Sequence, residues 1–253
     1  MIPLIILVLL AFALYIWICR PFFVVRFLWW IYGYTYDGLL DFYPYRNLIT
    51  LVGDRFAATE GRVLEIGCGT GNVLTSALVH SQDVVGIDLS SSMIGIAHRK
   101  HQSSIKSGQL VLGITSILPF LQKQPDCSFD TIVSVNVLYA LENRELIWKE
   151  LFRVLRPGGK MIMTTAVATG SKHLIREHID NDHRINLFRP KLVGVFLIDS
   201  LIDLLAGTGH FAFPSSSILK REVEKNGGRW VDERRCYGGE HSGVNVLFTV
   251  LKP

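Results

Sequence analysis

Three glycines at alternate positions form the first group of residues with a chemical implication. They lie in LEIGCGTGN, where Gly67, Gly69 and Gly71 follow a short apolar run. Glycine permits a tight turn and lets a ligand approach the backbone, because no Cβ stands in the way. The spacing is GxGxG and the next residue is Asn72, so the loop departs from the GxGxxG/A fingerprint of dinucleotide-binding folds and disfavours a nicotinamide-dependent oxidoreductase.

Two carboxylates accompany this loop. Glu65 lies in the run just before it, and Asp88 ends the next apolar run, 21 residues after Gly67. A carboxylate at that place can accept hydrogen bonds from two ribose hydroxyls. An isolated aspartate there is more typical of a helix cap, but the glycine loop upstream favours a ligand-binding role.

The elements that must position these residues follow a regular alternation from residue 61. The pattern predicts five strands, in RVLEIGC, DVVGIDL, QLVLGI, SFDTIVSVNVLYAL and KMIMTTAV. Helices are predicted between them in NVLTSALVH, SSSMIGIAHRKHQ and ENRELIWKELFRVLR, the last ended by Pro157, Gly158 and Gly159. Apolar strands separated by helices indicate a parallel sheet covered on both faces. A late helix, ILKREVEKNGG, precedes GRWVDERRCY and VNVLFTVLKP, which the short GGEHSG joins as an antiparallel hairpin.

The first 19 residues, MIPLIILVLLAFALYIWIC, carry no charge. A helix of that length would be roughly 28 Å long, near the thickness of a bilayer core, so we expect a single transmembrane anchor at residues 1–19. A cleaved signal peptide and a buried core helix are the alternatives. Arg20 and Arg26 flank the run on its C-terminal side and predict that the body of the protein lies in the cytoplasm.

Aromatic residues concentrate next to this run. Of the 27 Phe, Trp and Tyr in the chain, 14 lie in the first 45 residues. Aromatic rings gather at the membrane–water boundary, so residues 20–44 are predicted to form an interfacial segment and a lid. A core helix of the folded domain is the alternative for the same residues.

Composition excludes several classes of protein. Lys and Arg number 26 against 22 Asp and Glu, a net charge of +4, and this small excess argues against nucleic-acid binding. The four cysteines are scattered without metal-ligand spacing. His173, His178 and His183 recur every five residues and cannot share one helix face, so they are predicted to be exposed or capping, and no metal is expected.

The conjunction of these motifs resembles the class I S-adenosylmethionine-dependent methyltransferases, and is similar to their quinone-biosynthesis and phospholipid N-methyltransferase group. The likeness covers about residues 45–253 and rests on VLEIGCGTG, VVGIDLS, FDTIVSVNVLYAL and ELFRVLRPGGKMIMTT in this order. It implies an α/β fold, a Rossmann-like seven-stranded sheet with a closing antiparallel hairpin.

The resemblance implies S-adenosyl-L-methionine as cofactor and assigns residues to it. Those around the methionine part would be Glu65, Gly67, Cys68, Gly69, Gly71 and, at the end of the fourth strand, Asn136. Asp88 would hold the ribose, with Leu89 and Met93 beside the adenine. Where many relatives have Asp near the adenine amino group this chain has Ile114, so that contact would fall to Thr115, Ser116 or the backbone.

Methyl transfer requires alignment and exclusion of water more than a catalytic triad, because the sulfonium already activates the methyl group. Two tyrosines are the candidate catalytic residues. Tyr139 lies where relatives place a substrate-facing residue, with simple packing as the alternative. Tyr36, with Asp37, resembles an N-terminal lid, and Tyr36, Tyr43 or Tyr45 could face the sulfonium.

Residues 168–213 are predicted to form a cap over the substrate opening. They contain KLVGVFLIDSLIDLLAG, whose polar stripe is limited to Asp199, Ser200 and Asp203. Such a helix must be buried or touch lipid, although an extra helix packed on the sheet is the alternative. The sequence thus predicts a membrane-anchored methyltransferase for a lipid or lipid-soluble acceptor, a phospholipid amine or a quinone-like ring. A soluble small-molecule acceptor and a non-catalytic cofactor-binding scaffold remain the alternatives.

Overall fold

The computed structural model describes residues 29–57, 61–141, 143–167, 171–182, 193–195, 200, 212–238 and 243–253. The predicted transmembrane segment, residues 1–19, lies outside the described residues. Most of the apolar stretch at residues 191–207 lies outside them as well, so the predicted cap is described mainly by its first helix.

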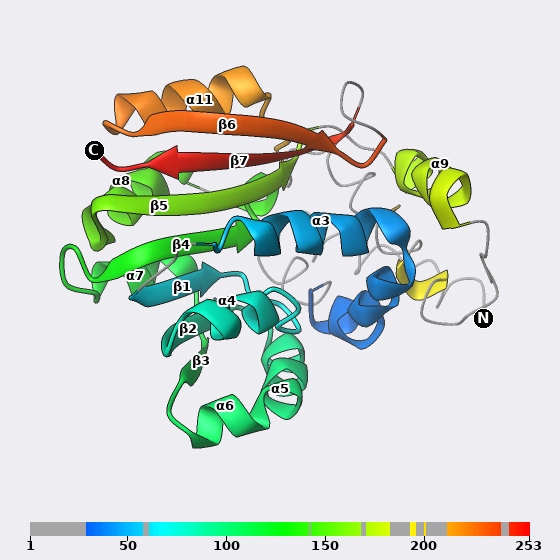
Figure 1. Cartoon of the computed structure of the whole chain (residues 1–253), viewed down its shortest axis with the longest axis horizontal. Helices are drawn as coiled ribbons and strands as arrows, with labels where there is room; N and C mark the ends of the chain where they lie inside the picture. The colour runs from blue at the N-terminus through cyan, green and yellow to red at the C-terminus, as the bar shows by residue number, and fades with distance from the viewer. Residues whose placement is uncertain are drawn as a thin grey trace, which may run out of the picture.

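Seven strands form one sheet in the order β3-β2-β1-β4-β5-β7-β6 (Figure 1). The strands are β1 (Arg62–Ile66), β2 (Asp83–Asp88), β3 (Leu110–Ile114), β4 (Phe129–Val135), β5 (Leu155–Ala166), β6 (Arg229–Cys236) and β7 (Asn245–Leu251). Strands β1 to β5 pair in parallel, and β7 runs antiparallel to both β5 and β6. The predicted parallel sheet and its closing hairpin are confirmed.

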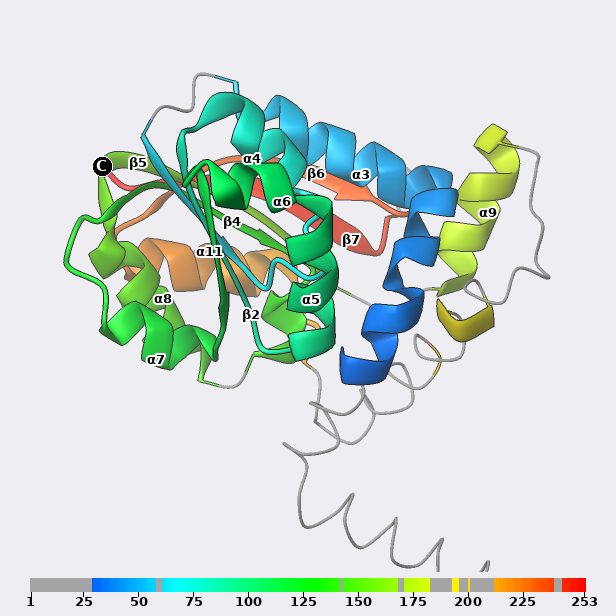
Figure 2. The ribbon, with the colours of Figure 1, turned by 90° about the horizontal axis from the view of Figure 1, so that it is seen from below.

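Helices cover both faces of the sheet, which Figure 2 shows from below. Core residues of α3 and α4 pack on one face, and those of α7, α8 and α11 pack on the other. The helical bounds are η1 (Tyr36–Asp41), α3 (Tyr43–Asp54), α4 (Leu74–His80), α5 (Ser91–Lys100), α6 (Gln102–Lys106), α7 (Ile117–Gln122), η2 (Leu138–Ala140), α8 (Arg144–Val154), α9 (Ser171–Asp182) and α11 (Ser216–Lys225). The two-sided cover explains why the central strands are apolar along their whole length.

The end of the predicted helix before the fifth strand differs from expectation. Helix α8 ends at Val154 and β5 begins at Leu155, ahead of the Pro157–Gly159 turn signal. Leu155 is in register with Phe129, and the register shifts before Thr131 pairs with Lys160. The proline and glycines therefore form an irregular start of the strand instead of a loop.

The aromatic segment packs against the domain along one side. Residues 29–35 are helical, and Tyr32 is buried. Ser90 and Ser92 donate hydrogen bonds to the carbonyl oxygens of Trp29 and Trp30, at 3.2 and 2.7 Å. The other side leaves Trp30 43% and Tyr34 60% exposed. One face of this helix therefore belongs to the core of the domain, as the alternative predicted, and the interfacial role of the exposed face stays a prediction.

His178 departs from the predicted exposure but fits the capping alternative. His178 of α9 is buried, where its Nδ1 accepts a hydrogen bond from the Tyr43 amide at 2.9 Å and its ring packs on Phe42. Tyr43 is the first residue of α3, so His178 caps the amino end of that helix and docks α9 on α3. His183 lies outside the described residues. Within the described ranges, His, Cys, Asp and Glu form no group of three that could hold a metal ion.

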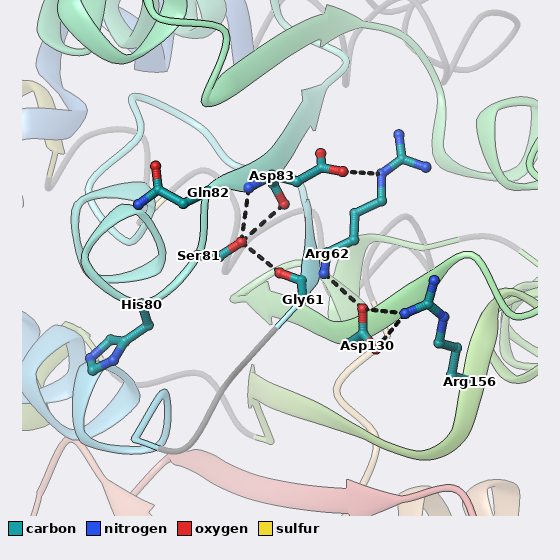
Figure 3. A pocket seen from close by; sticks show the side chains of 8 residues that line it. All are labelled: Gly61, Arg62, His80, Ser81, Gln82, Asp83, Asp130 and Arg156. Carbon is teal, nitrogen blue, oxygen red and sulfur yellow. Dashed lines mark hydrogen bonds and ion pairs between the residues drawn. The ribbon is translucent and has the colours of Figure 1, made fainter.

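A charged pocket of about 440 Å³ lies at the amino ends of the strands (Figure 3). Asp130 accepts hydrogen bonds there from the Arg62 amide and from the Arg156 guanidinium, at 2.7 to 2.9 Å. Arg62 also pairs with Asp83 at 3.3 Å. These contacts tie β1, β2, β4 and β5 together, at the edge of the sheet opposite the glycine loop.

Candidate cofactor and acceptor site

The glycine loop joins β1 to α4 at the carboxyl edge of the sheet, where ligands bind in open α/β folds. Gly67, Gly69 and Gly71 have φ of +67°, +54° and +80°, a region that other residues rarely adopt. A Cβ on Gly71 would lie 2.9 Å from the His101 ring, whereas a Cβ on Gly69 would meet nothing closer than Tyr36 at 3.8 Å. Close packing requires glycine at position 71, while Gly69 leaves space above the loop.

Asp88 lies beside this space, with both carboxylate oxygens oriented by the backbone. They accept hydrogen bonds from the amides of Gly69 at 2.9 Å and Ser90 at 2.8 Å. Burial raises the pKa of Asp88, and these amides partly oppose the shift. Because each carboxylate oxygen can accept more than one hydrogen bond, Asp88 retains capacity for a ligand.

Glu65 is a buried carboxyl group with an unpartnered oxygen. Its side chain is 2% exposed, and Oε2 has no hydrogen-bond partner. Burial, followed by the nearby charge of Asp88, raises its pKa well above the ordinary value. Burial also raises the pKa of the Cys68 thiol, which is therefore neutral. A carboxylate in this position needs a cationic partner or a proton.

The N-terminal segment is held on the glycine loop by Asp37. Its Oδ1 accepts hydrogen bonds from Thr70 Oγ1 at 2.7 Å, Lys100 Nζ at 2.8 Å and Asn72 Nδ2 at 3.5 Å. Sequence reasoning singled out the Tyr36–Asp37 pair as a lid but not these partners. Since two partners belong to the loop and the third to α5, the segment predicted to be a lid contacts the glycine loop and α5 directly.

Tyrosine rings stand next to Asp37. The rings of Tyr32 and Tyr36 and those of Tyr36 and Tyr45 meet edge to face, with centroids 5.1 and 5.9 Å apart. The Tyr45 hydroxyl donates to that of Tyr36 at 3.3 Å and accepts from Asn72. Burial raises the pKa of Tyr36 well above its ordinary value and that of Tyr45 to about 12, so both phenols are neutral at physiological pH.

A second polar group surrounds Asn136, which follows β4 with φ of +57°. Asn136 Oδ1 accepts hydrogen bonds from Thr164 at 3.1 Å and from Asn245 at 2.6 Å. Its Nδ2 donates to the Tyr237 hydroxyl at 3.4 Å. Sequence reasoning missed these three partners, although a polar residue at the start of the apolar strand VNVLFTVL was a signal for Asn245.

The remaining predicted residues divide into two groups. Met93 and Thr115 lie by the loop: Met93 Sδ is 4.0 Å from the position of a Gly69 Cβ, and the Thr115 amide donates to the Asp88 carbonyl. Leu89 adjoins Asp88, and Ser116 follows Thr115 as the N-cap of α7.

Tyr139 is buried and stacks on Phe213, with ring centroids 5.4 Å apart. The backbone amide of Tyr43 donates a hydrogen bond to His178.

Comparisons with known proteins agree with this geometry. Residues 64–163 match the family described as a methyltransferase domain. A fatty-acid O-methyltransferase of Mycolicibacterium smegmatis is 34% identical over 44% of this chain and 39% of its own length. The ubiquinone/menaquinone biosynthesis C-methyltransferase UbiE of Geotalea daltonii is 30% identical over 51% of this chain and 60% of its own.

The solved structures include a SAM-dependent methyltransferase from Aquifex aeolicus with a TM-score of 0.53, 16% identity, and coverage of 86% of this chain and 93% of that one. Such a likeness establishes the fold alone. The chain spans about half the length of the curated relatives that it matches. The sheet order, the glycine loop and the match over residues 64–163 together identify a class I S-adenosylmethionine-dependent methyltransferase domain in this chain.

Proposed function

We propose that the protein is a membrane-anchored methyltransferase that transfers the methyl group of S-adenosylmethionine to a lipid or lipid-soluble acceptor. The observation that carries its cofactor part is the unpartnered Glu65 carboxyl group near Asp88, with open space over Gly69 of the adjoining loop. A buried carboxylate without a partner is costly, and a cationic ligand removes that cost.

The residues fit the cofactor in chemical terms. Its amino acid part carries an ammonium group, which Glu65 is suited to bind, while the backbone at Gly69 permits a close approach. Asp88, oriented by two amides, can accept hydrogen bonds from ribose hydroxyls. Met93 and Leu89 offer apolar surface for the adenine, and Thr115 and Ser116 offer polar groups for its edge.

When bound, the cofactor supplies a methyl group already activated by its sulfonium. The protein must then align the acceptor and exclude water. The neutral phenols of Tyr36 and Tyr45 are suited to this task, because buried aromatic rings attract a cation and keep water out. Their raised pKa values argue against a role as general base near neutral pH. Tyr139, stacked on Phe213, would act through the shape of the acceptor pocket.

Membrane anchoring rests on the sequence and on one exposed face. The charge-free residues 1–19 have the length of a transmembrane helix. Trp30 and Tyr34 present exposed rings shortly after it, as interfacial anchors do. In the part of the chain that the structure describes, no helix combines the length and apolar character needed to cross a bilayer. The names of the relatives, a fatty-acid and a quinone methyltransferase, support a lipid-soluble acceptor.

The proposal is tested by a pair of glycine substitutions. Gly69→Arg should abolish binding of S-adenosylmethionine in calorimetry, because the side chain fills the space above the loop. Gly227→Arg is the matched control, since Gly227 also has positive φ, +80°, and nothing lies within 4 Å of its Cβ position. Equal binding by both variants would refute the cofactor site.

The acceptor is tested on membranes. Wild-type protein with methyl-labelled cofactor should label a compound that organic solvent extracts from membranes. Label confined to the aqueous phase would instead favour a soluble acceptor.

A further inference from the structure

Four polar side chains meet at the carboxyl edge of the sheet, and one of them, Asn136, is also predicted from the sequence to lie near the methionine part of the cofactor. They come from separate segments: Asn136 after β4, Thr164 in β5, Tyr237 after β6 and Asn245 at the start of β7. We refer to them as the asparagine–tyrosine cluster. Asn245 is 1% exposed and Tyr237 7%, so the cluster is largely removed from solvent.

The hydrogen bonds relate the orientation of the Asn245 amide to that of the Asn136 amide. Asn136 Oδ1 already accepts two hydrogen bonds, from Thr164 Oγ1 at 3.1 Å and Asn245 Nδ2 at 2.6 Å. Asn245 must therefore present its nitrogen to Asn136, since the opposite rotamer would bring two oxygens together. Its Oδ1 is left buried with no hydrogen-bond partner. Buried carbonyl oxygens are almost always paired, so this one is suited to a donor from outside the chain.

The cluster adjoins the proposed reaction centre. Asn136 directly follows β4, which pairs with β1, the strand that carries Glu65. Burial first, then Tyr45, Tyr32 and Tyr237, raise the pKa of Tyr36, so Tyr237 also lies near the lid tyrosines. An acceptor bound by the cluster would therefore lie between the lid and the ends of β4 and β5.

The charges favour an acceptor without phosphate. Three acidic groups, Glu65, Asp88 and Asp37, lie at the loop, and Lys100 pairs with Asp37 at 2.8 Å. An amide oxygen repels a phosphate oxygen but accepts a hydrogen bond from a hydroxyl. A phosphate group that approached the loop would therefore meet carboxylates first, which is unfavourable for an anion.

We infer that the asparagine–tyrosine cluster binds a hydroxyl group of the acceptor, and that the acceptor is an uncharged, hydroxyl-bearing lipid-soluble molecule such as a hydroquinone instead of a phospholipid amine. This inference rests on the proposed function and assigns the substrate class of the same site. Asn245 Oδ1 accepts from the hydroxyl, and the contacts of Asn136 with Thr164 and Tyr237 keep the amide of Asn245 in place.

Two variants test the residues in the full-length chain. Asn245→Ala removes the accepting oxygen, and Tyr237→Phe keeps the ring while removing a hydroxyl that supports Asn136. Loss of one hydrogen bond corresponds to roughly a 3- to 10-fold change, so each variant should raise KM for the acceptor by about that factor. The dissociation constant for S-adenosylmethionine should stay within about twofold of wild type. Asn226→Ala, which removes a single helix-end contact on α11, is the control and should change neither quantity.

The substrate class is tested with two probes and methyl-labelled cofactor. One is a prenylated hydroquinone in phosphatidylcholine vesicles, and the other is phosphatidylethanolamine vesicles. Label should enter the hydroquinone and not the phosphatidylethanolamine. Labelling of phosphatidylethanolamine, absence of label in the hydroquinone while the cofactor binds, or an unchanged KM in both variants would each overturn the inference. If wild type fails to bind the cofactor, the proposed function fails instead, and calorimetry separates the two cases.

Discussion

At the scale of single residues, the site contains groups that a purely structural protein would avoid. Glu65 is a carboxyl group buried in the sheet with an oxygen that has no partner, close to a second carboxyl, Asp88. The oxygen of Asn245 is buried in the same unpartnered way. Such groups reduce stability and are retained where a ligand supplies the missing partner.

Glu65→Gln should therefore stabilise the cofactor-free protein while weakening cofactor binding. The folded-state pKa of Glu65 lies above its unfolded value, so its unfavourable contribution is absent below the ordinary carboxyl pKa, about 4.3, and grows as pH rises through the raised pKa. At pH 7.5 the variant should melt about 3 °C higher, roughly 1 kcal/mol, and the gap should close as pH falls toward about 4.3. Affinity for S-adenosylmethionine should fall at least about tenfold by calorimetry.

Glu145→Gln is the control for this titration. Glu145 is exposed, and its hydrogen bond and charge pairing with Lys225 lower its pKa. Ionisation of Glu145 therefore favours the folded protein, whereas ionisation of Glu65 disfavours it. This variant should not gain stability at pH 7.5. A Glu65→Gln protein that melts below wild type at every pH would contradict the account of Glu65 as an uncompensated buried acid.

At the scale of elements, Asp37 ties the N-terminal segment, which is predicted to act as a lid, to the glycine loop. Asp37 contacts Thr70 and Asn72 of the loop and Lys100 of α5, with side chains of Asp37 and Lys100 only 23% and 30% exposed. The tyrosine rings and the exposed Trp30 belong to the same segment. A change in the position of this segment should therefore alter cofactor affinity through the contacts of Asp37 with the loop.

A double-mutant cycle with Asp37→Ala and Lys100→Ala measures this coupling. Because the pair is partly buried and shares Thr70, we expect a coupling free energy of about 1 kcal/mol in denaturant unfolding. Cofactor affinity should drop about three- to tenfold in Asp37→Ala, since the lid loses its contacts with the loop. The reference cycle is Glu145→Ala with Lys225→Ala, an ion pair of 2.6 Å whose side chains are 76% and 69% exposed and whose coupling should be near zero. Equal coupling in both cycles would mean that the Asp37 contact is an ordinary surface pair.

At the scale of the whole molecule, the helix at residues 29–35 is the described segment that follows the predicted anchor. It packs on the start of α5 through Ser90 and Ser92. The Ser90 amide also donates to Asp88, whose other oxygen accepts from the Gly69 amide of the glycine loop. An anchor at residues 1–19 would then bring the carboxyl edge of the sheet close to the bilayer. A lipid acceptor could enter there without crossing water.

Charge placed within the predicted anchor tests this arrangement. Leu9→Arg with Leu10→Arg should release the full chain from membranes on alkaline carbonate washing, because a charged residue at the centre of a span costs about 2.5–3.5 kcal/mol. Wild type should stay in the membrane pellet. Val79→Arg with Val111→Arg, two positions 75% and 58% exposed on the domain, is the matched control and should also stay. Release of wild-type protein by carbonate would rule out a transmembrane anchor.

The sequence by itself determined the order of the elements and the position of the glycine loop. Apolar runs of strand length, separated by helices with turn signals, are local patterns, and they predicted the parallel sheet and its hairpin. The same local patterns locate the candidate cofactor residues, because each lies within a few residues of a strand end. These residues are at positions 65, 67, 69, 71 and 88. The burial of His178 was not predicted, because its capping contact with α3 depends on the docking of α9 against that helix, which no local pattern encodes.

Only the tertiary structure decided which distant side chains meet. Asn136 lies 101 residues from Tyr237 and 109 from Asn245, and their contact requires β7 to pair with β5. The partners of Asp37 lie 33 to 63 positions away from it and carry no periodic signal, so they too depend on how the N-terminal segment packs on the loop. Periodicity reports which face of an element is buried, whereas the pairing of faces is decided by packing over the whole sheet.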